Sequence, residues 1–305
     1  MISRAFLFVL IGLVGSGVAA AHLVSGNSPS VLMLLAYGAA PVITVVTLVV
    51  GVTYGVARMH GSHVPAERRA DVFSILASVV REYWAHIVVF LVLAPFARFW
   101  MRDDSAKDTT RTEPPVLLVH GYLLNGAAWW RFARQLERAG FRAHVVSLTP
   151  SLGSIDTMAD SLRRRIEALC AASGATRVHL VAHSMGGLVC RAYLRNIGSA
   201  RVASLVTIAG PHHGTALAWL GIGEAARAMV PDSDWLAALA DAERQAVHPP
   251  TVALFSYYDN YIAPQESAML PWARNEALPP MGHAEMYFSR RLAARVCEAL
   301  RTRSA

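Results

Sequence analysis

The sequence predicts an α/β protein: a mostly parallel β-sheet with helices on both faces, preceded by an all-α transmembrane region. Three observations lead to this prediction. From residue 115 onward, strand-like and helix-like segments alternate along the chain. The strand-like segments are continuous apolar runs, which is the pattern of parallel strands buried on both faces. Before residue 100, two long stretches carry no charge at all, at Ala5–Val24 and Val31–Ala57.

Residues 1–100 are therefore predicted to be a membrane anchor with two to three transmembrane helices. Ala5–Val24 is 20 residues long and Val31–Ala57 is 27, and about 20 apolar residues suffice to cross a hydrocarbon core of roughly 30 Å. Arg4 and the small residues at Gly17–Ala21 also fit a cleaved signal peptide. The second long apolar stretch follows so closely that an anchor is favoured.

A third apolar segment, Tyr83–Trp100, is a weaker candidate for a crossing. It contains His86 and Pro95, and Arg98 lies near its end, where a long side chain can reach the lipid surface. Aromatic residues flank the segment, as they do at membrane interfaces. We expect the segment to span the bilayer, and the alternative is a helix that lies in the interface.

Loop charges predict the orientation of these helices. The loop Ser25–Ser30 is uncharged, whereas the stretch Arg58–Glu82 holds four arginines. Because positively charged loops remain in the cytoplasm, the N-terminus and residues 58–82 are expected inside. Three crossings would place the C-terminal domain outside the cytoplasm. Two crossings would leave it in the cytoplasm, which Arg102, Lys107 and Arg111 in or beside the polar linker 101–114 favour.

Residues 115–305 have the length of one α/β domain. Strands are expected at residues 116–119, 143–148, 178–181, 202–209 and 252–255, with helices near 129–138 and 155–172, one ending near 196, and one near 284–301. An insertion at about 216–250 is rich in large apolar residues. It is expected either to form a cap or lid over the carboxyl edge of the sheet or to pack onto the core.

The most informative segment is Val178–Leu188, where an apolar strand, a sharp turn and a helix meet at Ser184. Such a turn strains the backbone of its central residue, so the residues two positions away must be small, as Ala182 and Gly186 are. The hydroxyl would lie above a helix N-terminus, which favours developing negative charge. The pattern predicts a nucleophilic serine, and the alternative is a glycine-rich turn with an idle hydroxyl.

An acid and a histidine should follow a serine of this kind, in that order. Asp259 comes just after the strand-like run 251–256, and His283 lies in a loop before the last helical segment. Each could be an ordinary loop residue, but together they complete the expected order. His283 would accept the serine proton and return it to the leaving alcohol, while Asp259 would fix the tautomer of His283.

A tetrahedral intermediate also needs donors for its oxyanion. One candidate is the backbone N–H of Met185, the residue after the serine. The other is the backbone N–H of Tyr122, in the loop that follows the buried run 115–119. Gly121 would let this loop approach the site closely.

Residues from about 114 to 300 resemble the α/β-hydrolase superfamily, and within it the bacterial lipases and carboxylesterases. The resemblance rests on seven pieces in register, among them VLLVHGYLLNGAAWW (116–130), VAHSMGGLVCRAYL (181–194), LVTIAGPHHGT (205–215) and GHAEMYFS (282–289). It implies that Ser184, Asp259 and His283 form a catalytic triad with an oxyanion hole at Tyr122 and Met185. One position departs, because Ala182 stands where many relatives have glycine; some bacterial lipases share the alanine.

The resemblance also implies that His120, Gly121, His183 and His212 lie near the site. The pair His212 and His213 raises the question of a metal ion, but no carboxylate or cysteine accompanies it at ligand spacing. No metal and no cofactor are therefore predicted. The three cysteines, Cys170, Cys190 and Cys297, lie on predicted helices and are expected to be buried free thiols.

The expected function is that of a membrane-anchored serine hydrolase of a bacterial inner membrane. Its expected partners are the bilayer and a lipid or apolar ester. A net charge of +7, distributed over both regions, does not indicate a nucleic-acid partner, and the oligomeric state is not determined. Acyl transfer to an alcohol other than water is one alternative. A non-catalytic membrane or partner-binding protein is another, although an intact Ser184, Asp259 and His283 argue against it.

Overall fold

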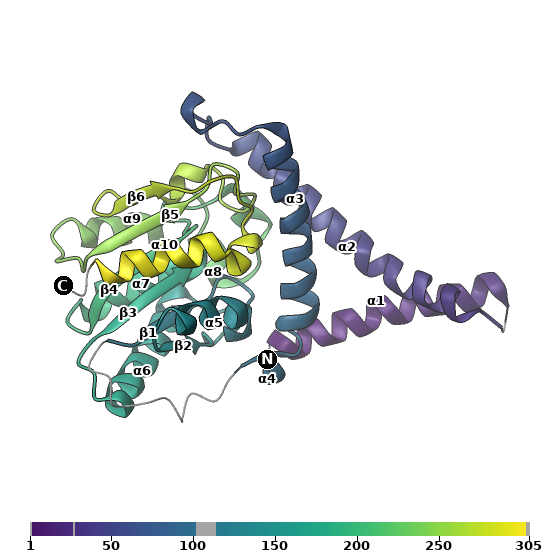
Figure 1. Cartoon of the computed structure of the whole chain (residues 1–305), viewed down its shortest axis with the longest axis horizontal. Coiled ribbons are helices and arrows are strands. Elements are labelled where there is room, and N and C mark those ends of the chain that lie inside the picture. The colour runs from purple at the N-terminus through teal and green to yellow at the C-terminus, as the bar shows by residue number, and fades with distance from the viewer. Residues whose placement is uncertain (1, 27, 102–113, 303–305) are drawn as a thin grey trace.

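The computed structural model describes residues 2–26, 28–101 and 114–302. A hairpin of two long helices, α1 (Ile2–Ser25) and α2 (Val31–His60), projects away from an α/β domain (Figure 1). A third helix, α3 (Val72–His86), runs beside that domain. The linker predicted at 101–114, with Arg102, Lys107 and Arg111, lies almost entirely outside the described residues.

The α/β domain is built on one six-stranded sheet in which every pairing is parallel. The spatial order is β2-β1-β3-β4-β5-β6. The strands are β1 (Val116–Val119), β2 (Ala143–Val146), β3 (Val178–His183), β4 (Val202–Ile208), β5 (Thr251–Phe255) and β6 (Arg274–Ala277). The predicted parallel sheet is confirmed. The sequence did not predict β6, because this edge strand is short, partly exposed and mostly polar.

Helices cover both faces of the sheet, as predicted. On one face, α5 (Trp130–Arg138) and α10 (Arg290–Arg301) supply buried residues such as Phe132 and Leu292 to one core cluster. On the other face, α6 (Ile155–Ser173), α7 (Met185–Ile197), α8 (Gly223–Ala228) and α9 (Asp234–Glu243) form a second cluster. The helix expected at 284–301 is divided: a 3₁₀ turn at Ala284–Phe288 precedes α10, and Ser289 caps α10 by accepting from the Leu292 N–H.

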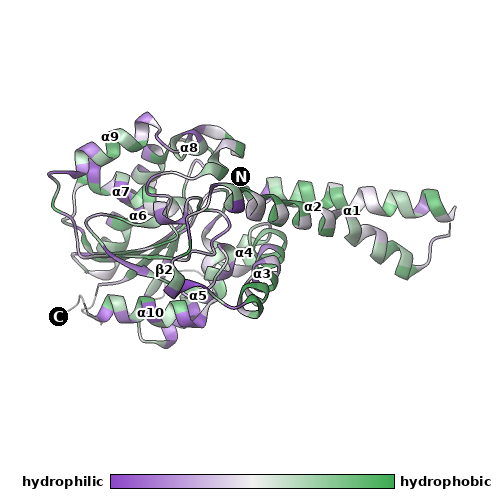
Figure 2. Ribbon diagram, turned by 90° about the horizontal axis from the view of Figure 1, so that it is seen from above, coloured by the Kyte–Doolittle hydropathy of each residue, from purple (hydrophilic) through white to green (hydrophobic). Residues whose placement is uncertain are grey.

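Three N-terminal helices are long and apolar enough to cross a bilayer, judged by length and composition: Ile2–Ser25, Val31–His60 and Val72–Leu93. The hairpin is coloured green to near-white, apolar to intermediate, along most of its length (Figure 2). Ser30 begins α2 by accepting a hydrogen bond from the Met33 N–H at 3.3 Å. These helices agree with the predicted anchor region.

The third segment does not have its predicted bounds. The helix begins at Val72, 11 residues before the predicted start at Tyr83, and continues as a π-helix over Ile87–Leu93. Asp71 sets the start, because its carboxylate accepts from the Ser74 N–H at 2.9 Å. The run ends before Pro95, which has no N–H to donate, and the short helix α4 (Ala97–Trp100) follows. Arg81 and Glu82, expected in a loop, are therefore inside the helix.

Candidate active site

The sequence-predicted site residues all lie at or just beyond the carboxyl ends of parallel strands. Tyr122 follows β1, Ser184 follows β3, Asp259 follows β5 and His283 follows β6. Parallel strands present their carboxyl ends at one edge of the sheet, where the crevice of an open α/β sheet lies. Tyr122 and His283, 161 positions apart in the sequence, are therefore brought to the same edge of the sheet.

Ser184 lies at the apex of a strained turn between β3 and α7. Its backbone has φ 57° and ψ −132°, a conformation that non-glycine residues rarely adopt. The turn fits only because its neighbours are small. A Cβ at Gly186 would come within 2.6 Å of the Val119 carbonyl oxygen, and a Cβ at Gly121 within 2.9 Å of the Ser184 Cβ. The Ser184 N–H donates to the Ile208 carbonyl at 2.9 Å, which holds the apex against β4.

His283 and Asp259 form a buried pair. The His283 Nδ1–H donates to Asp259 Oδ2 at 2.8 Å and lies 3.1 Å from Oδ1. Oδ1 also accepts from the N–H groups of Tyr261 and Ile262, at 2.7 and 3.0 Å. The carboxylate is thus fixed by the start of its own loop. The other ring nitrogen of His283, Nε2, has no hydrogen-bond partner among the described residues.

Two aromatic rings hold the His283 imidazole. The Tyr261 ring is stacked with it at 4.8 Å between centroids, and the His183 ring lies at 4.4 Å. His183 is the residue before Ser184, so this contact brings the histidine loop against the nucleophile turn. Ser184 Oγ and His283 Nε2 do not form a hydrogen bond in this structure. Such bonds are often long or poorly aligned until substrate binds.

The two predicted oxyanion amides are free to bind a ligand. Neither the Tyr122 nor the Met185 N–H donates to an acceptor within the described part of the chain. Met185 is the first residue of α7, where helical N–H groups have no partner within the helix. The Tyr122 hydroxyl accepts from the Ile222 N–H at 2.9 Å, which ties the oxyanion loop to the insertion.

The three buried histidines near the site are held by hydrogen bonds to the surrounding loops and to β4. His120 Nε2 accepts from the Leu148 N–H at 2.9 Å while Nδ1 donates to the Gly121 carbonyl at 2.8 Å. Burial lowers the pKa of His120 to about 4, so the ring is neutral at pH 7. His183 Nε2 lies 3.1 Å from the His283 carbonyl, and His212 Nε2 lies 3.1 Å from Thr207 Oγ1. Burial also lowers the pKa values of His183 and His212.

The histidine loop has a further support that sequence reasoning missed, namely Glu82 of α3. The carboxylate of this fully buried residue accepts from the N–H groups of Ala284 and Glu285, at 3.0 and 2.7 Å. It therefore caps the 3₁₀ turn that begins directly after His283. A Cβ at Gly282 would lie 2.6 Å from Glu82 Oε2, so only glycine allows this approach. One signal was available: an acidic residue in an apolar helical stretch needs a partner.

Helix α3 also supports the site through His86, whose Nε2 lies 2.8 Å from the hydroxyl of Tyr261. Helix α2 contributes in the same way. Asn260 accepts from the His283 N–H at 3.0 Å and donates to Thr53 Oγ1 at 2.7 Å. The N-terminal helices are thus in contact with the loops that carry both Asp259 and His283.

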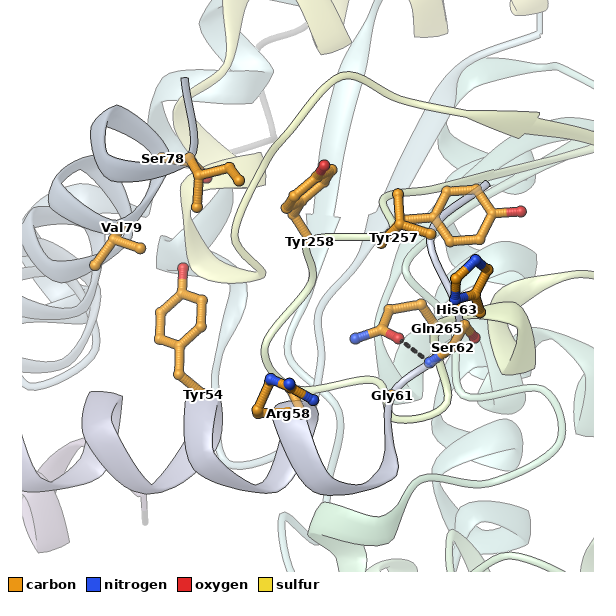
Figure 3. Close-up of a pocket in the computed structure, with 13 residues that line it drawn as sticks. Tyr54, Arg58, Gly61, Ser62, His63, Ser78, Val79, Tyr257, Tyr258 and Gln265 are labelled. Carbon is orange, nitrogen blue, oxygen red and sulfur yellow. Dashed lines mark hydrogen bonds between the residues drawn. The ribbon is translucent and has the colours of Figure 1, made fainter. Parts of the chain in front are cut away.

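A cavity of about 530 Å³ lies between α2, α3 and the loop before Asp259 (Figure 3). Gln265 lines it and connects the two sides. Its Oε1 accepts from the Ser62 N–H at 2.7 Å, the bond drawn in Figure 3. Its Nε2 donates to the Asp259 carbonyl at 2.9 Å. The chain that follows α2 is thereby attached to the backbone of the candidate acid.

The insertion at 216–250 has a buried side and an exposed side. Leu236 and Leu239 of α9 join the core, and the Arg191 guanidinium binds Glu243 through two hydrogen bonds of 2.8 and 2.6 Å. In contrast, Trp219 and Leu220 are mostly exposed, as is Ile222. The core-packing interpretation is confirmed for Leu236 and Leu239, and the cap over the carboxyl edge of the sheet stays a prediction.

The comparisons with known proteins agree with this architecture. Residues 114–226 match the family model described as alpha/beta hydrolase fold. A triacylglycerol lipase of Vibrio cholerae is 30% identical over 142 residues, which are 43% of this chain and 45% of the relative. A triacylglycerol lipase of Burkholderia plantarii is 34% identical over 124 residues, 37% of this chain and 34% of the relative. The chain therefore spans less than half of the length of these relatives.

Solved structures share the fold. The mature Bacillus licheniformis lipase BlEst2 aligns with a TM-score of 0.56 at 18% identity, covering 64% of this chain and 94% of that one. Aspergillus fumigatus lipase B aligns with a TM-score of 0.59 at 18% identity, covering 68% of this chain and 57% of that one. Strand order, the turn at Ser184 and the sequence matches lead to one conclusion: the domain that begins at residue 114 has the α/β-hydrolase fold.

Proposed function

We propose that the protein is a membrane-anchored serine hydrolase of lipase or carboxylesterase type, with Ser184, Asp259 and His283 as its triad. One observation carries the proposal: the buried His283–Asp259 pair lies against the strained turn that holds Ser184. A structural role for the pair would not require a serine in that conformation. The names of the relatives, triacylglycerol lipases, support the same reaction class.

The reaction would proceed through an acyl-enzyme. Ser184 Oγ attacks the carbonyl carbon of the ester as His283 Nε2 takes the hydroxyl proton. The tetrahedral intermediate collapses, the C–O bond to the leaving alcohol breaks, and His283 returns the proton to that alcohol. Water, activated by His283, then cleaves the acyl-enzyme and releases a carboxylic acid. Asp259 keeps Nδ1 protonated and stabilises the imidazolium that forms in each step.

The amides of Tyr122 and Met185 would bind the oxyanion. Their N–H groups are unpaired within the described residues, so no hydrogen bond has to break before they bind. Donors fixed in advance in a water-poor site stabilise the developing charge strongly, by about 3–4 kcal/mol for one donor in a comparable enzyme. The N-terminus of α7, with its partial positive charge, would also stabilise the oxyanion.

An apolar or lipid ester is the proposed substrate class. Trp219, Leu220 and Ile222 expose apolar surface on the insertion, next to the oxyanion loop that Tyr122 connects to it. The Trp219 ring also lies 5.4 Å from that of His60, at the end of α2. The exposed apolar part of the insertion is therefore close to where the hairpin leaves the bilayer, and a substrate could come from the lipid phase.

Fluorophosphonate labelling of membranes that contain the protein tests the proposal. The wild type should be labelled and should hydrolyse a p-nitrophenyl ester series, whereas Ser184→Ala should not be labelled and should lose about 10⁶ in kcat. Ser173→Ala, a serine on α6 whose hydroxyl binds the Leu169 carbonyl, is the matched control and should react normally. Equal labelling of wild type and Ser184→Ala would refute the assignment. Ester products formed with added alcohol in place of free acid would indicate acyl transfer.

A further inference from the structure

One face of the third helical segment, Val72–Leu93, is in contact with the α/β domain along its whole length. Just before its start, the Ala70 N–H donates to the Tyr258 hydroxyl at 2.7 Å. In its middle, Ser78 Oγ donates to Glu285 Oε2 at 2.9 Å. Near its end, Val89 is fully buried in the core cluster that contains Phe132. The segment has 22 residues, a length of about 33 Å at 1.5 Å per residue.

The opposite face of the same helix is apolar and exposed. Phe73, Leu76, Val80 and Trp84 are 84, 56, 57 and 60% exposed. Their spacing of three, four and four residues places them in one stripe, which we call the α3 stripe. A stripe of large apolar residues that covers nothing in the described part of the chain requires a partner outside it.

This arrangement is incompatible with a third membrane crossing. A bilayer core is about 30 Å thick, so a spanning Val72–Leu93 segment would carry the adjoining loops of the α/β domain into the hydrocarbon. Arg81 and Glu82 would then lie near the bilayer centre, where each charged residue costs about 2.5–3.5 kcal/mol or more. Arg81 donates to the Glu285 carboxylate of the domain, so Glu285 would also have to enter the hydrocarbon.

The hairpin of α1 and α2, unlike α3, can cross a bilayer without carrying the domain into it. In Figures 1 and 2, α1 and α2 project away from the domain, whereas α3 runs beside the domain and across the direction of the hairpin. The hairpin tip, Ser25–Ser30, carries no charge. Arg4, Arg58, Arg68 and Arg69 are all at the other end, on the side of the domain.

We propose that only α1 and α2 cross the bilayer, and that α3 lies flat on it with the α3 stripe immersed in the lipid interface. The partner of this surface is the bilayer, because α3 adjoins the proposed anchor: the hydroxyl of Tyr83 on α3 lies 3.1 Å from Thr47 Oγ1 on α2. The α/β domain is then on the same side as the N-terminus, and the arginines place that side in the cytoplasm. The proposal replaces the third crossing and the extracytoplasmic domain expected from the sequence.

Sidedness is tested in the full-length protein by single added cysteines and a membrane-impermeant maleimide. The three native cysteines are buried and give little background. Ser28→Cys reports on the exposed hairpin tip and Thr302→Cys on the exposed end of α10. In right-side-out vesicles only Ser28→Cys should be labelled, and in inverted vesicles only Thr302→Cys. Labelling of both from the same side would mean three crossings and would overturn the proposal.

Depth is tested by attaching a fluorophore to Phe73→Cys, Val80→Cys and Trp84→Cys in vesicles of phosphatidylethanolamine and phosphatidylglycerol. A nitroxide high on the acyl chain should quench all three equally, and one at the chain end should quench them weakly. Leu48→Cys, exposed on α2, is the control. It should be quenched strongly by the nitroxide at the chain end and weakly by the one high on the chain. A depth that changes from residue 73 to 84 would contradict the proposal. So would stripe positions that escape both quenchers and instead cross-link two copies of the chain.

Discussion

At the scale of single residues, Asp259 is fixed before any substrate arrives. Its carboxylate accepts two backbone N–H groups of its own loop as well as the His283 Nδ1–H. Charge-assisted hydrogen bonds of this kind are short and directional. The imidazole can therefore rotate little about its contact with Asp259, and only its Nε2 is available for proton transfer.

Asp259→Asn should lower kcat by about 10⁴ with a small change in KM, because an amide supports the wrong histidine tautomer. The measurement is steady-state hydrolysis of p-nitrophenyl butyrate by protein purified in detergent. Asp241→Asn is the matched control, since Asp241 pairs with the exposed Arg244 on the surface and its replacement should leave turnover unchanged. If Asp259→Asn retained wild-type turnover, a different acid would have to be sought.

At the scale of elements, α3 has an exposed apolar face and a buried polar face, and the two have different partners. The α3 stripe faces away from the domain, while Glu82 and His86 face the loops of His283 and Tyr261. A helix that is apolar enough to count as a membrane span thus also positions the candidate base. Its buried polar groups are satisfied by the domain rather than by other helices.

Glu82→Gln should reduce kcat about tenfold to a hundredfold while changing KM little. A glutamine oxygen can replace one of the two acceptors, but its NH₂ group would face an N–H donor, and a small displacement of a catalytic group has a large effect on rate. The measurement is kcat and KM for a short ester, with fluorophosphonate labelling rate as a second readout. The exposed Glu67 provides the control, Glu67→Gln, which should behave as wild type. A Glu82→Gln enzyme whose thermal stability falls but whose kcat is unchanged would show that Glu82 only stabilises the fold.

At the scale of the whole molecule, buried neutral histidines make stability depend on pH. The pKa of His120 is lowered to about 4 by burial, and the same cause lowers the pKa values of His183 and His212. In the unfolded chain these groups titrate near pH 6.5. Between those values the unfolded state binds more protons, so the free energy of unfolding is largest above pH 6.5 and falls as the pH is lowered toward 4.

Thermal unfolding in detergent should therefore show a steep loss of stability from pH 7 to pH 4.5, with His120 alone contributing on the order of 3 kcal/mol. His120→Asn should lower stability at pH 7 but flatten this pH dependence. His63→Asn, an exposed histidine, should leave the curve as in the wild type. A pH dependence identical in wild type and His120→Asn would contradict the buried neutral ring.

Most of the architecture follows from local sequence patterns. Continuous apolar runs predicted β1, β3, β4 and β5 within one or two residues, and uncharged length predicted α1 and α2. The turn at Ser184 could be predicted equally well, because its pattern of a central serine between small residues occupies only five consecutive positions. The order of Asp259 and His283 after it could also be read from the chain.

What the sequence by itself determined is therefore what depends on residues close together in the chain: the apolar strands, the long helices α1 and α2, and the turn that carries Ser184. Only the tertiary structure decided how these parts meet. Glu82 lies about 200 positions from the turn it caps, as does Thr53 from Asn260. Polar β6 becomes a strand because β5 pairs with it, and α3 lies along the domain because its polar face finds acceptors and donors there. Such pairings depend on which groups are adjacent in space. Hydrophobic periodicity is a local pattern and cannot predict them.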